Sequence, residues 1–319
     1  INDTLTIFIF SDTYVGNKNQ TSRQESGLTM VSNTVASQQC LANGRTEVNY
    51  FWNKMHTDSP EPFFKSYTDR YRFWVNDAFT ANGNLYVLLS KIGPKYGPEP
   101  DNIFNFSGLG FTLAKINNPY ANPHKWNIES FPLPDFPGAS MIIGCPAIEN
   151  SYLYLMITIN DTSQFLVRKH IDHIDHAEIP YEYFARNKKW KKNILVEDMY
   201  EIANGFRCNS INYHPDINKW VMINDIRFRD NKITMRTSSE LIGPWSDDKV
   251  IYEIPEVTPG DPSYSESNFC YLAREHIQYY DTNNHEMLLT YDVNNSNFSE
   301  ILRYPEIYTP KIIKVALKK

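Results

Sequence analysis

A short run of mostly hydrophobic residues recurs along the chain at nearly constant spacing. Tyr86, Tyr154, Val221 and Leu288 mark equivalent points of four runs and lie 68, 67 and 67 residues apart. Each run follows a turn signal, is rich in β-branched, aromatic and long aliphatic residues, and is too short for a helix, so it predicts a strand. The copies span 85–89, 153–157, 220–223 and 287–290, with an earlier one at 5–10.

A repeat of this length indicates radial or stacked units of several strands each. Five copies predict an all-β fold, a five-bladed β-propeller. The repeat runs through the whole chain, and no Pro/Ser/Gly-rich linker divides it, so we expect one domain over residues 1–319. The blades are expected over approximately 1–66, 67–137, 138–200, 201–262 and 263–319. In each blade an inner strand should precede the repeated strand, and two outer strands should follow it.

The first blade departs from this pattern. Its repeated strand, 5–10, begins so close to Ile1 that its inner strand would have to lie upstream of the chain. We expect either that this strand was trimmed or that the blade is completed in another way, for example by pairing between the two termini. Helical periodicity is scarce, and the best candidate for a helix is 194–202.

Composition supports a sizeable core and excludes some partners. Hydrophobic residues make up 41% of the 319 residues and aromatic residues 14%, which suits sheets packed face to face. The net charge of −6 argues against a nucleic-acid partner held by phosphate contacts. The one basic run, 186–192, fits a solvated hairpin. No stretch approaches the roughly 18 apolar residues of a membrane span. We expect a monomer.

The chain begins with Ile, and no signal peptide is visible, which favours a processed protein that is secreted or extracytoplasmic. Six Asn-X-Ser/Thr sites would permit glycosylation of a secreted protein. Because the chain is rich in Asn, several of these sites could arise by chance, so glycosylation stays open. The sites begin at Asn2, Asn19, Asn105, Asn160, Asn294 and Asn297.

The four cysteines do not form a disulfide framework in a chain of this length. No close Cys or His pair suggests a metal site, so buried free thiols are favoured over ligands. We expect no required cofactor and no metal in the active site, although a structural cation in the central channel is compatible with the fold. The cysteines are Cys40, Cys145, Cys208 and Cys270.

Several repeated strands end in an acid. These acids are Asp12, Asp161, Asp225 and Asp292. An aspartate at a strand end usually caps a turn by accepting backbone N–H bonds, and this interpretation is favoured for the last three. Asp12 differs because Thr13-Tyr14-Val15-Gly16 and then a long segment follow it.

The expected inner strands carry polar side chains close to the propeller axis. Burying charge is costly without partners. These side chains therefore predict either a paired structural network or a polar ligand site, and the sequence does not decide between the two. They are Asn76 and Asp77 in the second blade, Arg207 and Asn209 in the fourth, and Arg274, Glu275 and His276 in the fifth.

Three segments resemble a known group of propellers. FSDTYVG at 10–16 resembles the Gly/Ser-Asp-Thr motif near the start of five-bladed glycosidase-like propellers, and SELIGPWS at 239–246 resembles their S-x-L-x-G-P-W-S segment. AREH at 273–276, followed by LLTYDVN at 288–294, is similar to their last-blade pattern. The chain thus resembles the formerly uncharacterised domain family that includes bacterial endo-D-arabinanases and, more distantly, the family 43 glycosidases.

The resemblance implies a glycoside hydrolase-like propeller that hydrolyses a furanoside or a related polysaccharide with carboxylates in the funnel. Asp12 is then the candidate base or nucleophile. Asp77 would orient the sugar or tune a neighbouring pKa. Glu275 is the candidate acid, since a carboxyl among apolar neighbours can be held protonated.

The same resemblance implies that the remaining polar and aromatic groups of the funnel bind a carbohydrate. We expect sugar hydroxyls to be bound by Arg207, Arg274 and His276, and a sugar ring to stack on Tyr71 or Trp74. Two alternatives stay open: a propeller that binds carbohydrate without catalysis, and a protein-interaction propeller that uses its rim. The absent inner strand of the first blade weakens the enzymatic interpretation, since relatives often place a funnel carboxylate there.

Overall fold

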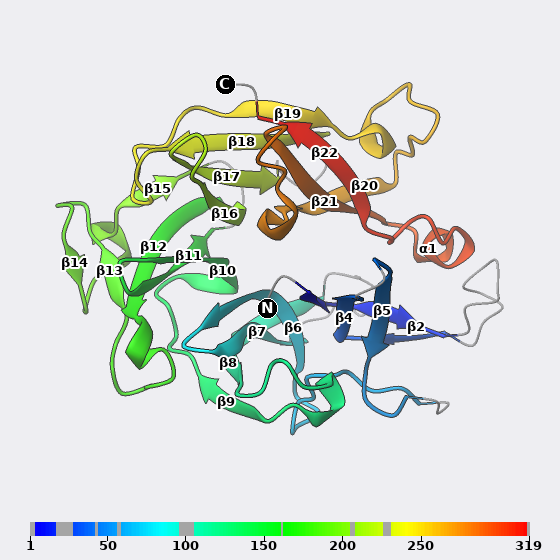
Figure 1. The fold of residues 1–319 in the computed structure, drawn as a ribbon, viewed down its shortest axis with the longest axis horizontal. Coiled ribbons are helices and arrows are strands. Elements are labelled where there is room, and N and C mark those ends of the chain that lie inside the picture. Colours follow the sequence, from blue (N-terminus) through cyan, green and yellow to red (C-terminus); the bar gives the residue numbers. More distant parts are fainter. Residues whose placement is uncertain are drawn as a thin grey trace.

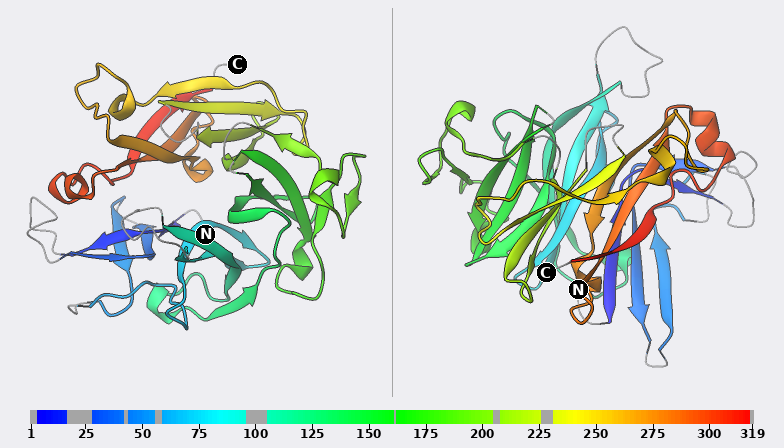
Figure 2. Two further views of the ribbon diagram at one scale, coloured as in Figure 1. Left: turned by 180° about the vertical axis from the view of Figure 1, so that it is seen from behind. Right: turned by 90° about the horizontal axis from the view of Figure 1, so that it is seen from above.

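The computed structural model describes residues 4–16, 28–41, 44–55, 59–95, 105–160, 162–204, 208–225 and 231–317. Their strands form six sheets, of which five are blades arranged around a central axis (Figure 1) and the sixth is a two-stranded hairpin, so the predicted five-bladed β-propeller is confirmed. Figure 2 shows the same ring from behind and edge-on, with two strands of the first blade extending beyond the other blades on one side.

Within every blade, neighbouring strands run antiparallel and follow chain order from the axis outwards, except that β15 of blade three pairs with β12. Blade one holds β1 (Leu5–Phe10), β4 (Thr34–Cys40) and β5 (Thr46–Phe51), with the hairpin β2 (Thr13–Val15) and β3 (Thr29–Val31) beside it. Blade two holds β6 (Arg72–Ala81), β7 (Asn84–Pro94), β8 (Phe106–Ile116) and β9 (Ile128–Pro132). Blade three holds β10 (Ala139–Glu149), β11 (Tyr152–Ile159), β12 (Ser163–His170), β13 (Glu182–Phe184), β14 (Trp190–Lys191) and β15 (Glu201–Ala203). Blade four holds β16 (Cys208–His214), β17 (Lys219–Asp225), β18 (Lys232–Ser238) and β19 (Lys249–Glu253). Blade five holds β20 (Asn268–Glu275), β21 (Glu286–Asn295) and β22 (Lys311–Ala316).

The repeated hydrophobic runs are β1 and the second strands β7, β11, β17 and β21. The helix expected over 194–202 is wrong. That segment contains one short 3₁₀ turn, Val196–Asp198, and then enters β15, which pairs with the edge of β12. In the described part of the chain the one α-helix is α1 (Phe298–Arg303), which begins where the Asn297 side chain accepts a hydrogen bond from the Ser299 amide.

Blade one is open at the axis. β1 pairs with β4 along one edge, and none of the described strands pairs with its other edge. Ser11, just after β1, instead anchors the chain to blade two: its Oγ donates to the Val75 carbonyl and accepts from the Val75 amide. The described parts of the two termini do not pair with each other to close the ring.

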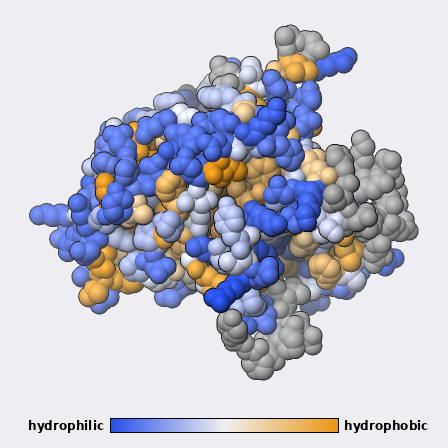
Figure 3. All heavy atoms as spheres, turned by 90° about the horizontal axis from the view of Figure 1, so that it is seen from below, coloured by the Kyte–Doolittle hydropathy of each residue, from blue (hydrophilic) through white to orange (hydrophobic). Residues whose placement is uncertain are grey.

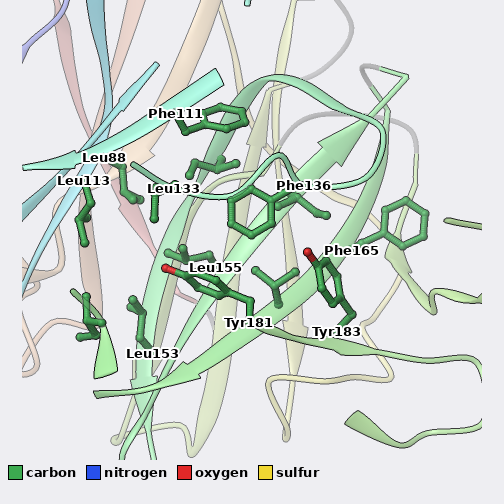
Figure 4. Close-up of a cluster of buried hydrophobic side chains, with 14 of the residues drawn as sticks. Leu88, Phe111, Leu113, Leu133, Phe136, Leu153, Leu155, Phe165, Tyr181 and Tyr183 are labelled. Carbon is green, nitrogen blue, oxygen red and sulfur yellow. The ribbon is translucent and has the colours of Figure 1, made fainter. Parts of the chain in front are cut away.

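Four clusters of buried apolar side chains fill the interfaces between successive blades, from one/two to four/five. Figure 4 shows the cluster between blades two and three, where Leu88 and Leu113 face Leu153 and Leu155. The middle blades bury both faces of their second strand. In β11, for example, Leu155 belongs to the cluster with blade two and Met156 to the cluster with blade four. Their sequences therefore read as unbroken apolar runs.

The interface between blades five and one is built differently. Phe8 lies against Tyr279, with ring centroids 6.4 Å apart, and against His276 at 6.3 Å. Tyr14 meets Tyr308 edge to face at 5.7 Å. Aromatic side chains with polar groups thus form this interface, whereas the other four contain apolar clusters of aliphatic and aromatic side chains.

The outer surface is mostly polar. On the face that Figure 3 draws, hydrophilic side chains dominate and hydrophobic ones form small, separate patches. Among the described residues, no helix has the length and apolar character needed to cross a bilayer. The Cys145 and Cys270 side chains are buried, as expected, whereas that of Cys40 is exposed at the end of β4, so burial of Cys40 was wrongly expected.

Candidate functional site

Asp12 lies at the point where blades one and two meet, directly after β1. Its side chain is partly buried. The indole Nε1 of Trp74, on β6, donates to Asp12 Oδ1 at 2.8 Å. The Trp74 ring is held by the edge of Phe106, at a centroid distance of 4.7 Å, and by the Arg72 guanidinium, 5.6 Å from its centroid. The structure therefore brings together two predicted site residues, Asp12 and Trp74.

Burial dominates the electrostatics of Asp12. It raises the pKa of this carboxyl from 3.8 to about 6, although the charge of Arg72 and the hydrogen bond from Trp74 both act to lower it. Arg72 is exposed, and its charge is therefore screened by water. A carboxyl with this pKa can donate or accept a proton at mildly acidic to neutral pH.

Blade five contributes two tyrosines and a second acid to the surroundings of Asp12. Tyr271 lies opposite Asp292 in the pairing of β20 with β21, and the Tyr271 hydroxyl accepts from Asn294 Nδ2 at 3.2 Å. Burial, together with the charges of Asp292 and Asp12, raises the pKa of Tyr271 and of its hydrogen-bonded neighbour Tyr308. Both hydroxyls thus remain protonated and lie within range of the charges of two carboxyl groups.

Asp77 sits in a separate place, inside a network that ties three blades together. Its Oδ1 accepts from the Ala78 amide at 2.9 Å and from Arg274 Nη1 at 3.0 Å, and its Oδ2 accepts from the Cys145 amide at 3.0 Å. Arg274 also donates to the Asn76 carbonyl at 2.9 Å. Burial raises the pKa of Asp77, while Arg274 opposes that shift. The structure thus supplies the paired network that the sequence offered as one of two alternatives.

β-Bulges create this network. The inner strand β6 changes register between Val75 and Asp77, and β20 does so between Tyr271 and Arg274. Leu272 in the second bulge and Cys145 in β10 have positive φ angles of 58° and 51°. Such bulges redirect neighbouring side chains and backbone groups. Here they aim Asp77, Arg274 and the Cys145 amide at one point.

Glu275 points into the interface of blades four and five. Its side chain is 1% exposed, accepts from Asn212 Nδ2 at 2.9 Å, and lies 3.1 Å from His214 Nε2, on a ring that is fully buried. Its backbone amide donates to Ser210 Oγ. The structure does not bring Glu275 together with Asp12, and it gives the carboxyl polar neighbours in place of the apolar ones expected.

The other predicted binding residues are dispersed. His276 bonds to Thr290 Oγ1 at 2.8 Å, and burial and the charge of Arg274 lower the pKa of His276 to about 4, so its ring is neutral at neutral pH. Tyr71 packs edge to face against Phe73 in the cluster between blades one and two. Arg207 lies outside the described residues.

Sequence reasoning missed three members of the Asp12 surroundings: Tyr271, Tyr308 and Asp292. The expectation that Asp292 caps a turn is wrong, because it lies within β21, opposite Tyr271. Its presence in the repeated acid pattern was the available signal. Tyr308 has no such signal, since its place depends on the return of the chain after α1, where its amide donates to the Val293 carbonyl.

Within the described ranges, no group of three or more His, Cys, Asp or Glu side chains could hold a metal ion. The cation suggested for the central channel stays a prediction. The residues around Asp12 instead offer a carboxyl of raised pKa, a second acid, tyrosine donors and an indole, which together suit proton transfer and the binding of hydroxyl-rich molecules.

Comparison with solved structures shows the fold shared with other five-bladed propellers. The chain is similar to the crystal structure of a "putative hydrolase" from Bacteroides ovatus, with a TM-score of 0.71 and 17% identity over 98% of this chain and 82% of that one. Weaker likenesses include the GH43 protein BlXynB from Bacillus licheniformis (TM-score 0.45, 10% identity, 98% of this chain and 53% of that chain). Another is the catalytic domain of a GH62 α-L-arabinofuranosidase from Coprinopsis cinerea (TM-score 0.43, 10% identity, 96% and 90%).

No curated protein matches the sequence. The expected five-bladed β-propeller is confirmed at the level of the fold, which this chain shares with the Bacteroides ovatus structure. A family model matches residues 1–317, which is nearly the whole chain. The chain belongs to the family described as a domain of unknown function, DUF5005.

Proposed function

We propose that this propeller is a glycoside hydrolase that acts on a furanoside or related polysaccharide and that Asp12 is its proton donor. One observation carries the proposal: a partly buried carboxyl with its pKa raised to about 6 stands among the tyrosines and the second acid of blade five. The sequence alone favoured a base or nucleophile at this position. The raised pKa favours the acid, since a donor must hold its proton near the working pH.

Asp292 is the carboxyl that we assign to the second role, as base or nucleophile. Its charge acts on the same two tyrosines as that of Asp12, which supports a shared site for the two acids. Glycosidases need two such carboxyls, and the distance between them decides between inversion and retention. Tyr271 and Tyr308 would donate to sugar hydroxyls, and Trp74 would hold the Asp12 carboxyl in place.

Asp77 and Glu275 fit structural roles better. Asp77 already accepts three hydrogen bonds, one of them from Arg274. The Glu275 side chain is 1% exposed and occupied by Asn212 and His214. Both carboxyls are thus already occupied by hydrogen bonds within the protein, so our proposal moves the second catalytic role to blade five.

The test measures hydrolysis of aryl furanosides and furanoside-containing polysaccharides by the unmodified protein and by Asp12→Asn. We expect turnover to fall about 10²- to 10⁴-fold, the range associated with a positioned general acid. The matched control is Asp172→Asn, which changes an aspartate whose side chain is 66% exposed and should leave turnover unchanged. If the natural protein hydrolyses a substrate and Asp12→Asn hydrolyses it equally fast, the assignment of Asp12 is wrong.

A pH profile adds a second readout. With Asp12 as the acid, kcat/KM should fall as pH rises above about 6, where the carboxyl loses its proton. The Asp12→Asn variant should lose this limb. A profile that instead rises through pH 6 would assign Asp12 to the base role.

A carbohydrate-binding protein without catalysis is the second candidate. The observation in its favour is that two of the three carboxyls expected to act in the funnel are engaged in structural bonds. Calorimetry with the same polysaccharides separates the candidates. Saturable binding with no cleavage by the unmodified protein would support binding alone.

A further inference from the structure

A cavity of about 250 Å³ lies between blades two and three, on the outer side of the ring and apart from Asp12. Its walls come from the segment that follows β9 and from the segment between β12 and β13. Much of the lining is apolar or aromatic: Pro132, Pro134, Ile174, Ile179, Pro180 and Tyr183. A cavity of roughly 150 Å³ is enough to hold benzene, so this one can hold a substituted six-membered ring.

One wall of the cavity carries a cation that is almost completely removed from solvent. Lys169, in β12, is 4% exposed. Its ammonium lies 4.9 Å from the ring centroid of Tyr181 and donates to the His176 carbonyl at 2.7 Å. Within the described part of the chain this is the one hydrogen bond made by its three donors. A buried charge with so few partners is costly unless something else compensates it.

The nearby acids do not provide full compensation. Asp175 lines the same cavity and is already paired with Lys115 at 2.5 Å. Glu178 is 71% exposed and lies 2.9 Å from His176 Nδ1. A further cation, Lys192, lies in the lining and is exposed. Burial lowers the pKa of Lys169, and the charges of Glu178 and Asp175 only partly oppose this shift.

We propose that this cavity is a binding site for a small organic monocarboxylate with a flat apolar body. The carboxylate would accept from the Lys169 ammonium, forming the charge-assisted pair that Lys169 lacks among the described side chains. The prolines, the isoleucines and Tyr183 would cover the apolar body. The site is independent of the proposed hydrolase chemistry at blades one, two and five.

The test uses benzoate as the probe and benzamide as its uncharged counterpart, with binding to the intact chain followed by ligand-observed NMR and calorimetry. We expect benzoate to bind saturably and at least about tenfold more tightly than benzamide, the difference expected for a charge-assisted hydrogen bond. Equal binding of the two probes, or no saturable binding of benzoate, overturns the proposal.

Two variants locate the site. Lys169→Met keeps the aliphatic stem and removes the charge, so the preference for benzoate should disappear. Ala177→Phe adds a ring at an exposed position of the lining and should block both probes. This second variant leaves Lys169 in place, so it remains informative if Lys169→Met does not fold. Lys192→Met, which changes only the exposed cation, should weaken the binding of benzoate by a smaller factor than Lys169→Met does. Unchanged binding of benzoate by both Lys169→Met and Ala177→Phe would place it elsewhere and refute the proposal.

Discussion

The two faces of β21 belong to two different kinds of blade interface. Along this strand, buried and partly buried residues alternate without interruption from Glu286 to Asn295. Met287, Leu289, Tyr291 and Val293 are buried against blade four. The residues between them, which include Thr290 and Asp292, face blade one and stay partly buried. Since successive side chains in a strand point to opposite faces, one segment serves a dry interface and a polar one.

The difference between the apolar and the polar interface explains where a carboxyl can be placed without a full ion pair. The apolar interfaces hold the ring together through burial, and a carboxyl placed there would be costly unless it is paired, as Glu275 is. The interface of blades five and one has tyrosine hydroxyls and ring edges that accept polar neighbours. Asp12, where blades one and two meet, acts by its charge on two of these tyrosines and keeps a raised pKa, at some cost in stability.

The largest expected stability effect compares two adjacent leucines in β21. Leu289 is fully buried in the cluster with blade four, so Leu289→Ala should lower the free energy of unfolding by about 3 kcal/mol. Leu288 is partly buried on the other face, so Leu288→Ala should cost about 1 kcal/mol or less. Urea unfolding of both variants measures this. Equal losses would show that the two interfaces are packed alike.

The ion pair between Asp77 and Arg274 offers the next largest effect. The Asp77 side chain is 12% exposed and that of Arg274 28%, so Arg274→Met should destabilise the protein by about 2 kcal/mol, less than for a fully buried pair. The double variant with Asp77→Asn should be more stable than Arg274→Met alone, because it no longer leaves an unpaired buried carboxylate. Additive losses in a double-mutant cycle would exclude coupling between the two side chains.

Replacing Asp12 should raise the free energy of unfolding, whereas the preceding substitutions lower it. Because its pKa rises from 3.8 in the unfolded chain to about 6 in the folded one, the folded state binds the proton more tightly. The stabilisation that the bound proton gives the folded state is therefore fully present below pH 3.8 and is lost as pH rises through 6. Asp12→Asn should therefore gain about 2 kcal/mol at pH 8, after a discount for partial exposure, and little or nothing at pH 4. Urea unfolding at both pH values checks this, and a loss of stability at pH 8 would contradict it.

The smallest expected effect on stability comes from removing the buried hydroxyl of Tyr181 in the apolar cluster between blades two and three. Tyr181 is 2% exposed in the cluster between blades two and three, and its hydroxyl has no hydrogen-bond partner among the described residues. Tyr181→Phe removes this buried hydroxyl and should leave stability unchanged or raise it by up to about 1 kcal/mol. Thermal unfolding measures the change. A clear destabilisation would mean that the hydroxyl has a partner, for instance a bound water.

Part of the candidate site was predictable and part was not. Asp12 was identified from the sequence because it follows a repeated strand and precedes a long segment. Trp74 was identified because it lies on an expected inner strand. Their bond to each other depends on Ser11 docking to Val75, a contact between residues 64 positions apart. Glu275 looked like a funnel acid because it lies in β20. A bulge in that strand and the neighbouring His214 decided its direction.

The sequence by itself determined the five repeats, the strands and the departure of the first blade from the pattern. It could do so because side-chain burial on a strand follows a period of two and because the spacing of the repeats can be read along the chain without knowledge of tertiary contacts. It even contains the contrast between interfaces, since β17 reads as continuous Val-Met-Ile and β21 as Leu-Thr-Tyr-Asp-Val. Only the tertiary structure decided which acids meet. Bulges, the turn after α1 and the meeting of blades five and one bring together residues about 300 positions apart, such as Tyr14 and Tyr308. The tertiary surroundings then decide which carboxyl is paired and which has a raised pKa.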